Sequence, residues 1–340
     1  MTDIIKKFAF ALLIVLTAAS MLSCGYNAVG YQPSGLSSLI AFSSDRDNTL
    51  HIYTVKPDGT DMKNTSADNT TFDGLPMWSP DGARIAFATS GSGDFEICTM
   101  KEDGSDRKQI TSRQGWDGSP RWSPDGSKVV FVAQIKDEKG VSDFEIFAVN
   151  ADRSNLTQLT GGLTREVHEE HEEPEEESGH EHVHSHGMGI DIWNSVPTWS
   201  PDGSKILFAS NREGDGRTPF LYTMNPDGSD QKKFGFPSEI DGTEPDWSPA
   251  TNKIVFVRGT AAKGDIWVMD AGSPFPILTA KKITDNKDNN RSPVWSPDGK
   301  QIAFVADTYG DDDIFIMNAD GGNIRRVTYD KSNERHPTWR

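Results

Sequence analysis

Trp199-Ser200-Pro201-Asp202-Gly203 is one of four identical copies of a five-residue motif in this chain of 340 residues. The other intact copies start at Trp78, Trp122 and Trp295, a degenerate copy (Trp-Ser-Pro-Ala-Thr) starts at Trp247, and a truncated copy ends the chain at Trp339-Arg340. Successive tryptophans of the motif are 44, 77, 48, 48 and 44 residues apart. A period near 45 residues is typical of the four-stranded blade of a β-propeller.

Each repeat divides into four short strands. A segment ending in Pro-x-Trp is expected to be the innermost strand. Ser-Pro-Asp-Gly after it predicts a tight turn, because proline fixes φ at the second turn position and glycine accepts positive φ. A second strand follows, such as 205–209, and then a third, such as 265–269. The third strand carries an aromatic residue in five repeats and a cysteine in the sixth: Tyr53, Cys98, Phe147, Tyr222, Trp267 and Phe315.

The order of the strands is offset at the two ends of the chain. The first recognisable strand, 39–42, has no Trp strand before it, and the last, 336–339, is a Trp strand with nothing after it. The final strand is therefore expected to complete the blade begun at residues 36–65, which removes the exposed edges. The sequence predicts an all-β fold: a six-bladed β-propeller of four-stranded antiparallel blades, closed by pairing of the C-terminal Trp strand with the N-terminal blade.

The repeated motif also carries a family resemblance. Trp-Ser-Pro-Asp-Gly, followed by Ile-Ala-Phe and later by Asp-Ile-[Tyr/Phe]-x-Met-Asn-x-Asp-Gly, resembles the TolB-type (PD40, WD40-like) propeller repeat over residues 34–340. The resemblance implies the fold more firmly than a function, since one fold hosts many activities. TolB carries an α/β domain before its propeller, and only about ten residues separate Cys24 from the first strand here. The resemblance therefore implies a variant without that domain.

The N-terminus reads as a targeting segment. Lys6 and Lys7 precede the apolar stretch 8–16, which is too short to span a bilayer comfortably. The sequence 21–25, Met-Leu-Ser-Cys-Gly, resembles the lipobox of bacterial lipoproteins, in which the cysteine is lipidated. We therefore expect a signal peptide over 1–23, a lipidated tether over 24–35 that begins at Cys24, and the propeller over 36–340. This predicts a lipid-anchored protein outside the cytoplasm, in the periplasm or on the cell surface of a bacterium.

The charge of the chain limits its partners. With 34 basic and 51 acidic residues the net charge is −17, which argues against nucleic acid because phosphate binding needs a basic face. The partners expected are an envelope protein, a peptide or a glycan, with the membrane reached only through the lipid anchor. A monomer is expected.

One connection between repeats is much longer than the others. The link from Thr160 to Trp199 is about 28 residues longer than the others, and residues 166–187 contain nine Glu and no Lys or Arg. We expect a His/Glu-rich disordered insertion over 164–190, because this composition cannot build a core. Imidazoles and carboxylates favour divalent metals, so Zn, Ni or Cu on 166–187 is the one cofactor suggested, and none is certain. The candidate ligands are His168, His171, His180, His182, His184 and His186.

Polar residues recur at the start of the predicted inner strands. These positions converge on one mouth of the channel and form the candidate ligand-binding ring: Asp73, Asp117, Asn194, Asp241, Asn290 and Glu334. The alternative is that Asp and Asn cap tight turns there. Trp116 and Trp193 lie in loops at the same mouth and are candidate aromatic contacts.

No catalytic motif stands out, so no catalytic residue is assigned. The first hypothesis is a non-catalytic lipoprotein propeller that binds a protein, peptide or glycan, with metal on its His/Glu loop. One alternative is a polysaccharide lyase or hydrolase acting at the propeller mouth, which the resemblance to oligogalacturonate lyases permits. Another is an envelope metal-handling protein that uses the propeller as a scaffold.

Overall fold

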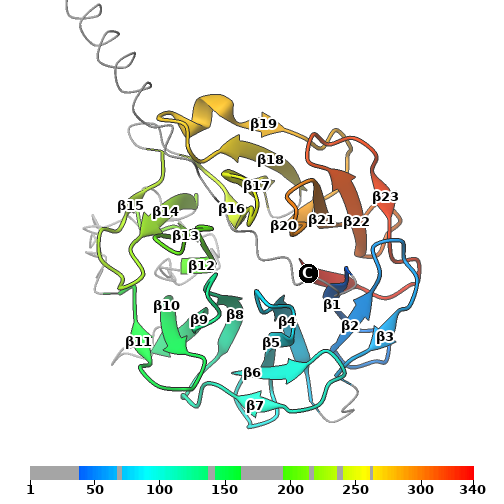
Figure 1. Cartoon of the computed structure of the whole chain (residues 1–340). Helices are drawn as coiled ribbons and strands as arrows, with labels where there is room; N and C mark the ends of the chain where they lie inside the picture. The colour runs from blue at the N-terminus through cyan, green and yellow to red at the C-terminus, as the bar shows by residue number, and fades with distance from the viewer. Residues whose placement is uncertain are drawn as a thin grey trace, which may run out of the picture.

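The computed structural model describes residues 38–66, 71–136, 142–161, 194–213, 218–235, 240–260 and 263–340. These residues form six four-stranded antiparallel sheets arranged as blades around a central channel (Figure 1). The predicted signal peptide, tether and His/Glu insertion lie outside the described residues. No helix in the described part of the chain has the length and apolar character needed to cross a membrane.

Strands of the same rank occupy the same place in every blade. The innermost strands are β24 (Glu334–Trp339), β4 (Asp73–Trp78), β8 (Asp117–Trp122), β12 (Asn194–Trp199), β16 (Thr243–Trp247) and β20 (Arg291–Trp295). The second strands are β1 (Ile40–Ser44), β5 (Arg84–Thr89), β9 (Lys128–Lys136), β13 (Ile206–Ser210), β17 (Lys253–Thr260) and β21 (Gln301–Ala306). The Trp motif therefore ends each inner strand, as predicted.

The outer half of each blade pairs a third strand with a two-residue outer strand. The third strands are β2 (His51–Val55), β6 (Glu96–Lys101), β10 (Ser142–Asn150), β14 (Phe220–Met224), β18 (Lys263–Asp270) and β22 (Asp313–Asn318). The two-residue outer strands are β3 (Lys63–Asn64), β7 (Lys108–Gln109), β11 (Thr157–Gln158), β15 (Lys232–Lys233), β19 (Lys281–Lys282) and β23 (Arg325–Arg326). One 3₁₀ helix, η1 (Pro276–Thr279), precedes β19.

The Ser-Pro-Asp-Gly turn is held by its own side chains. In the copy at 200–203, the Gly203 N–H donates to the Ser200 carbonyl over 2.8 Å, and Gly203 has φ 70°. The Ser200 hydroxyl donates to Asp202 over 2.6 Å and accepts the Lys205 N–H over 2.9 Å. Since these bonds need serine, aspartate and glycine at fixed offsets, the motif sets the reversal from each inner strand into the next strand.

Aromatic pairs fill the middle of the blades. The six largest fully buried side chains are phenylalanines of the second strands: Phe42, Phe87, Phe131, Phe208, Phe256 and Phe304. Each lies opposite the third-strand residue expected from the repeat, as Phe208 does with Tyr222 and Phe87 with Cys98. Apolar clusters lie between neighbouring blades, for example the one joining Phe208 and Trp199 to Val130 of the preceding blade. The core is thus distributed between the sheets around the ring.

The C-terminal strand closes the ring, as predicted. β24 is the inner strand of the sheet β24-β1-β2-β3, with Trp339 opposite Ile40 and Thr338 opposite Ala41. Leu39 and Arg340 exchange two backbone hydrogen bonds of 3.1 and 3.0 Å. The two ends of the propeller are therefore paired by hydrogen bonds within one blade.

Candidate functional site

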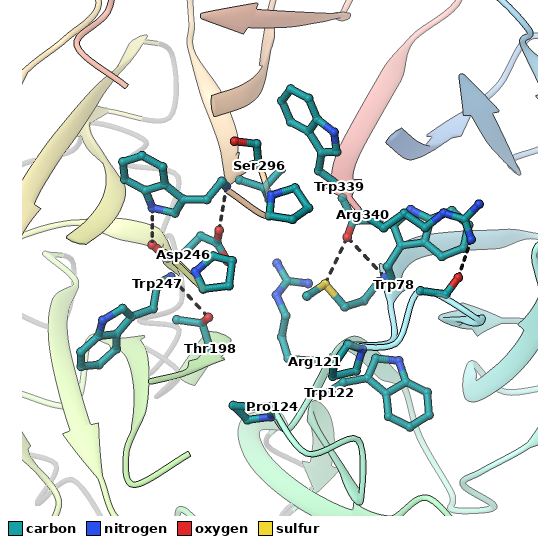
Figure 2. A pocket seen from close by; sticks show the side chains of 18 of the residues that line it. Trp78, Arg121, Trp122, Pro124, Thr198, Asp246, Trp247, Ser296, Trp339 and Arg340 are labelled. Atoms are coloured by element: carbon teal, nitrogen blue, oxygen red, sulfur yellow. Dashed lines mark hydrogen bonds between the residues drawn. The ribbon is translucent and has the colours of Figure 1, made fainter. Parts of the chain in front are cut away.

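A cavity of about 430 Å³ opens at the channel end where the Trp-Ser-Pro turns meet (Figure 2). Its wall is formed by the motif tryptophans of all six blades and by five motif prolines, Pro80, Pro124, Pro201, Pro249 and Pro297. Ser38 also lies at this cavity, and the Trp339 Nε1–H donates to the Ser38 hydroxyl over 2.7 Å. The chain thus joins the first blade at the rim of the cavity.

A bulge in every inner strand shapes the channel. The residue before the strand proline has a left-handed backbone, with φ between 45° and 55° at Leu75, Ser119, Val196, Glu244, Ser292 and His336. The strand register shifts at the same place in each blade, for instance between Thr243 and Asp246. Such bulges re-aim the side chains around them. The residue just before each motif Trp lines the cavity: Met77, Arg121, Thr198, Asp246, Val294 and Thr338.

Two of these six residues are charged. Asp246 is buried, accepts the Trp295 backbone N–H over 2.9 Å, and has its pKa raised to about 6 by burial, which the charge of Arg121 opposes. Arg121 points into the cavity (Figure 2). Its Nη1 donates to the Pro120 carbonyl over 3.2 Å, while its buried Nε has no hydrogen-bond partner. Burial lowers the pKa of Arg121, although arginine stays charged at neutral pH.

Two further ionisable groups contribute to the electrostatics of the channel. Glu244 accepts the Ser292 backbone N–H over 2.5 Å, and burial raises its pKa. Burial, together with the charges of Arg335, Arg121 and Arg291, lowers the pKa of His336 to about 4, so this imidazole is neutral at pH 7. No hydrogen bond or ion pair joins Arg121, Asp246, Glu244 and His336 to one another within the described ranges.

The predicted ligand-binding ring lies at the opposite ends of the inner strands. The rise per residue of a strand places it about 16 Å from the motif tryptophans. Five of its six residues are buried, and Asp241 is the partly exposed one. Five of the six residues are each bonded by an arginine side chain. The donors are Arg113 to Asp117 (2.8 Å), Arg46 to Glu334 (2.8 Å), Arg212 to Asn194 (2.6 Å), Arg258 to Asp241 (2.5 Å) and Arg107 to Asp73. Asn290 donates to the Gly264 carbonyl over 3.2 Å and to Asn286 over 2.7 Å. All six residues therefore bond within the protein, while Asp117 Oδ2 and Glu334 Oε2 are buried without a partner among the described residues.

The arginines of these contacts also stack on blade aromatics. The Arg113 guanidinium lies 4.4 Å from the Phe147 ring centroid, and that of Arg46 lies 4.5 Å from Tyr53. Burial raises the pKa of Asp117 to about 6 and that of Glu334 to about 8, with the paired arginines opposing both shifts. Because a guanidinium can bond a carboxylate at its edge while it stacks on a ring, each contact ties an inner strand to the outer part of the blade.

The remaining sequence candidates divide between described and undescribed parts of the chain. Trp116 is half-buried, and its ring contacts Phe144 edge to face at 5.9 Å. Trp193, Cys24 and the six histidines of the insertion lie outside the described residues. Within the described ranges, no three His, Cys, Asp or Glu side chains gather as a metal site would require.

The sequence reasoning did not single out the cavity-lining position. The signal was present, because aligning the six repeats on Trp shows Arg121 and Asp246 as the two charged residues directly before it. Neighbouring residues of a strand point to opposite faces. When the motif Trp packs between two blades, the residue before it therefore turns away from that packing and toward the channel. The acidic residues that recur at the start of the inner strands instead pointed to the opposite mouth of the channel.

Comparisons with known proteins agree with the architecture. The sequence matches the TolB beta propeller domain family (PD40) over residues 63–170 and 238–340, more than half of the chain. TolB from Acinetobacter baumannii superimposes with a TM-score of 0.65 at 20% identity, covering 89% of this chain and 66% of that one, just under two thirds of its length. Hydrazine synthase from Kuenenia stuttgartiensis gives 0.66 at 18% identity, covering 89% and 46% of the two chains. A search among curated proteins gave no match.

A further solved structure bears on the enzyme alternative. An oligogalacturonate lyase in complex with manganese superimposes with a TM-score of 0.50 at 14% identity, covering 82% of this chain and 85% of that one. At such identities a structural likeness shows the fold and leaves function to the site. The family match over most of the repeats and the six closed blades together show that the chain belongs to the TolB β-propeller (PD40) family.

Proposed function

We propose that this protein is a non-catalytic, lipid-anchored propeller of the bacterial envelope that binds a peptide segment of a partner protein in the cavity on its Trp-Ser-Pro face. The observation that carries the proposal is the cavity itself, a concave site with apolar walls and a few polar groups. Such a combination is typical of ligand sites. The opposite mouth is a weaker candidate, because its polar residues already bond within the blades.

The walls favour a peptide over a glycan. Sugars stack on exposed aromatic faces, whereas Trp78, Trp122, Trp199 and Trp295 are only 3 to 8% exposed. Their rings are packed between blades, as Trp199 is against Val130, and Trp247 and Trp339 are the two motif tryptophans that are partly exposed. These surfaces suit apolar and extended peptide segments better than a pyranose ring.

The geometry also supports binding over the lyase or hydrolase alternative. An acid–base pair needs groups within hydrogen-bond reach of each other or of a shared reacting atom. Arg121, Asp246, Glu244 and His336 share the channel, yet no hydrogen bond joins them in the described ranges, and both carboxylates already hold backbone N–H groups.

Anchoring through Cys24 is part of the proposal and fits the position of the cavity. Cys24 and Ser38 are fourteen positions apart in the sequence, and an extended chain of that length reaches at most about 48 Å. Because Ser38 lies at the cavity rim, a tether of this reach keeps the Trp-Ser-Pro face near the membrane. A membrane-associated partner would then meet the cavity directly.

The test is peptide selection with the cavity rim blocked. Peptides selected from a displayed library on the parent protein are expected to bind Pro124→Trp and Pro201→Trp at least about tenfold more weakly, since the indole fills the rim. Pro226→Trp is the matched control, because Pro226 occupies the same position in an outer turn on the same face, Asn225-Pro226-Asp227-Gly228, away from the cavity. In the same cells, the parent should fractionate with membranes and Cys24→Ser should not.

Two results would contradict the proposal. Selected peptides that bind the rim variants as tightly as the parent would remove the cavity from the binding site. Binding to glycans on an array, with no peptide enriched, would show that the partner class is wrong.

Metal binding by the His/Glu insertion is a second proposal, which rests on the composition of residues 166–187. Calorimetric titration with Zn²⁺ at pH 7.5 is expected to show binding to the parent and at least about tenfold weaker binding after deletion of 166–187, because imidazole and carboxylate ligands are lost. Changing its six histidines to Gln is the control that keeps length and acidity. Equal Zn²⁺ affinity of parent and deletion would refute metal capture by this loop.

A further inference from the structure

Arg121 is one of the two arginines that line the cavity, together with Arg340. Of the six residues directly before the motif tryptophans, Arg121 is the only cation; Asp246 is the only anion. Arg121 reaches the floor of the cavity from β8 and points toward its centre (Figure 2). Nothing in the repeat demands arginine there, because Met, Thr and Val occupy the same position in other blades.

The guanidinium has unused donors. Arginine carries five N–H groups, and among the described residues Arg121 uses one, toward the Pro120 carbonyl. Its Nε is buried without a partner. Unpaired buried polar groups are uncommon in native structures, and a water, an ion or a ligand can complete their hydrogen bonds. Arg121 thus differs from the arginines of the opposite mouth, which bond carboxylates or amides of their own blades.

The neighbouring carboxylates do not satisfy Arg121. Asp246 is directed to the Trp295 backbone N–H and Glu244 to that of Ser292. Both stabilise the positive charge from a distance but form no ion pair with it in the described part of the chain. The donors that face the cavity therefore remain available.

Size and charge select the class of ligand. A single carboxylate can bond the free donors of the guanidinium, while Asp246 and Glu244 nearby disfavour the second negative charge of a dianion such as phosphate. Arg340, the other arginine at the cavity, already pairs with Glu102 over 2.6 Å and stacks on Trp78. The proline and indole walls favour apolar groups beside that charge. We propose that Arg121 is the anchor for a single peptide carboxylate inserted into the channel from the Trp-Ser-Pro face, an inference that rests on the proposed function.

The test compares an acid with its neutral isostere. N-acetyl-Pro-Phe and N-acetyl-Pro-Phe-amide are titrated separately into ¹⁵N-labelled protein while the indole N–H signals are followed. For the parent, the acid is expected to bind about tenfold more tightly than the amide, since a charge-assisted bidentate contact is worth at least this factor. Amides that carry Asp or Asn before the C-terminus then distinguish a side-chain carboxylate from a C-terminal one.

Variants of Arg121 test whether its guanidinium causes the difference in affinity between the acid and the amide. Arg121→Met should bind acid and amide equally and fold as stably as the parent, because an unpaired buried charge is replaced by an apolar side chain. Arg121→Lys should keep part of the preference, since lysine lacks the planar fork. Arg325→Met, on the exposed outer strand β23, is the control and should behave as the parent.

Several results would overturn the inference: equal affinity of acid and amide for the parent, a preference that survives Arg121→Met, no indole shift with either dipeptide, or tighter binding of inorganic phosphate than of the acid. The results that would contradict the proposed function differ from those that would contradict the carboxylate anchor. Selected peptides that bind the parent and are blocked at the rim, but show no dependence on Arg121, would leave peptide binding standing and remove only the carboxylate anchor.

Discussion

Removal of Pro337–Arg340 is expected to lower the melting temperature by about 10 °C or more, or to prevent folding. The four residues supply the half of β24 that pairs with Ile40 and Ala41 of β1, together with both backbone bonds to Leu39. Their loss exposes the edge of β1, all five of whose residues are buried in the intact protein. Packing of the partly buried Trp339 contributes about 2 kcal/mol and each lost backbone hydrogen bond about 1 kcal/mol, so the total loss should exceed about 5 kcal/mol.

Two comparisons make this prediction specific to strand pairing. A synthetic peptide of residues 333–340 should raise the melting temperature of the truncated chain in a concentration-dependent way, and a scrambled peptide should not. The full-length variant Lys331→Ala, at an exposed position shortly before β24, should melt as the parent does. A truncated chain that melts within about 2 °C of the parent would show that the closure contributes little.

Phe208→Ala is expected to destabilise the protein by about 3–5 kcal/mol, because it opens a cavity in the middle of a blade. Phe208 is fully buried, and its ring stacks on Tyr222 at 5.7 Å within the cluster that joins two blades. Thermal unfolding followed by circular dichroism should show a fall of about 5–10 °C in the melting temperature. Phe208→Leu should lose less, since much of the volume is kept.

Phe72→Ala is the matched control for this core substitution. Phe72 is 53% exposed, so its removal should change stability by no more than about 0.5 kcal/mol. If the two alanine variants melted alike, the six second-strand phenylalanines could not be the centre of the blades.

Much of the fold follows from the repeat. The turn at 200–203 forms from residues adjacent in sequence, and the spacing of the tryptophans gives the number of blades. The third-strand aromatics were predictable because they recur at one offset, and the closure because two incomplete repeats complement each other. These features depend on local turn chemistry and on periodicity, and both can be recognised from the order of the residues alone.

The candidate site was less predictable. Asp117 and Glu334 recur with the repeat, which suggested a ring of ligands, but recurrence does not tell whether a carboxylate faces solvent or an arginine from elsewhere. Their partners Arg113 and Arg46 lie at different offsets, 4 residues before Asp117 and 288 residues before Glu334. Only the packed blade brings these groups together over an aromatic ring.

The sequence by itself determined the six blades, the turns between first and second strands, the third-strand aromatics and the closing strand, because each arises from residue types at fixed spacings. The tertiary structure decided which channel end is hollow and which charged group remains unsatisfied there. Those properties depend on how six inner strands, distant in sequence, converge on one axis, and on the bulge before each strand proline that directs Arg121 and Asp246 into the same cavity.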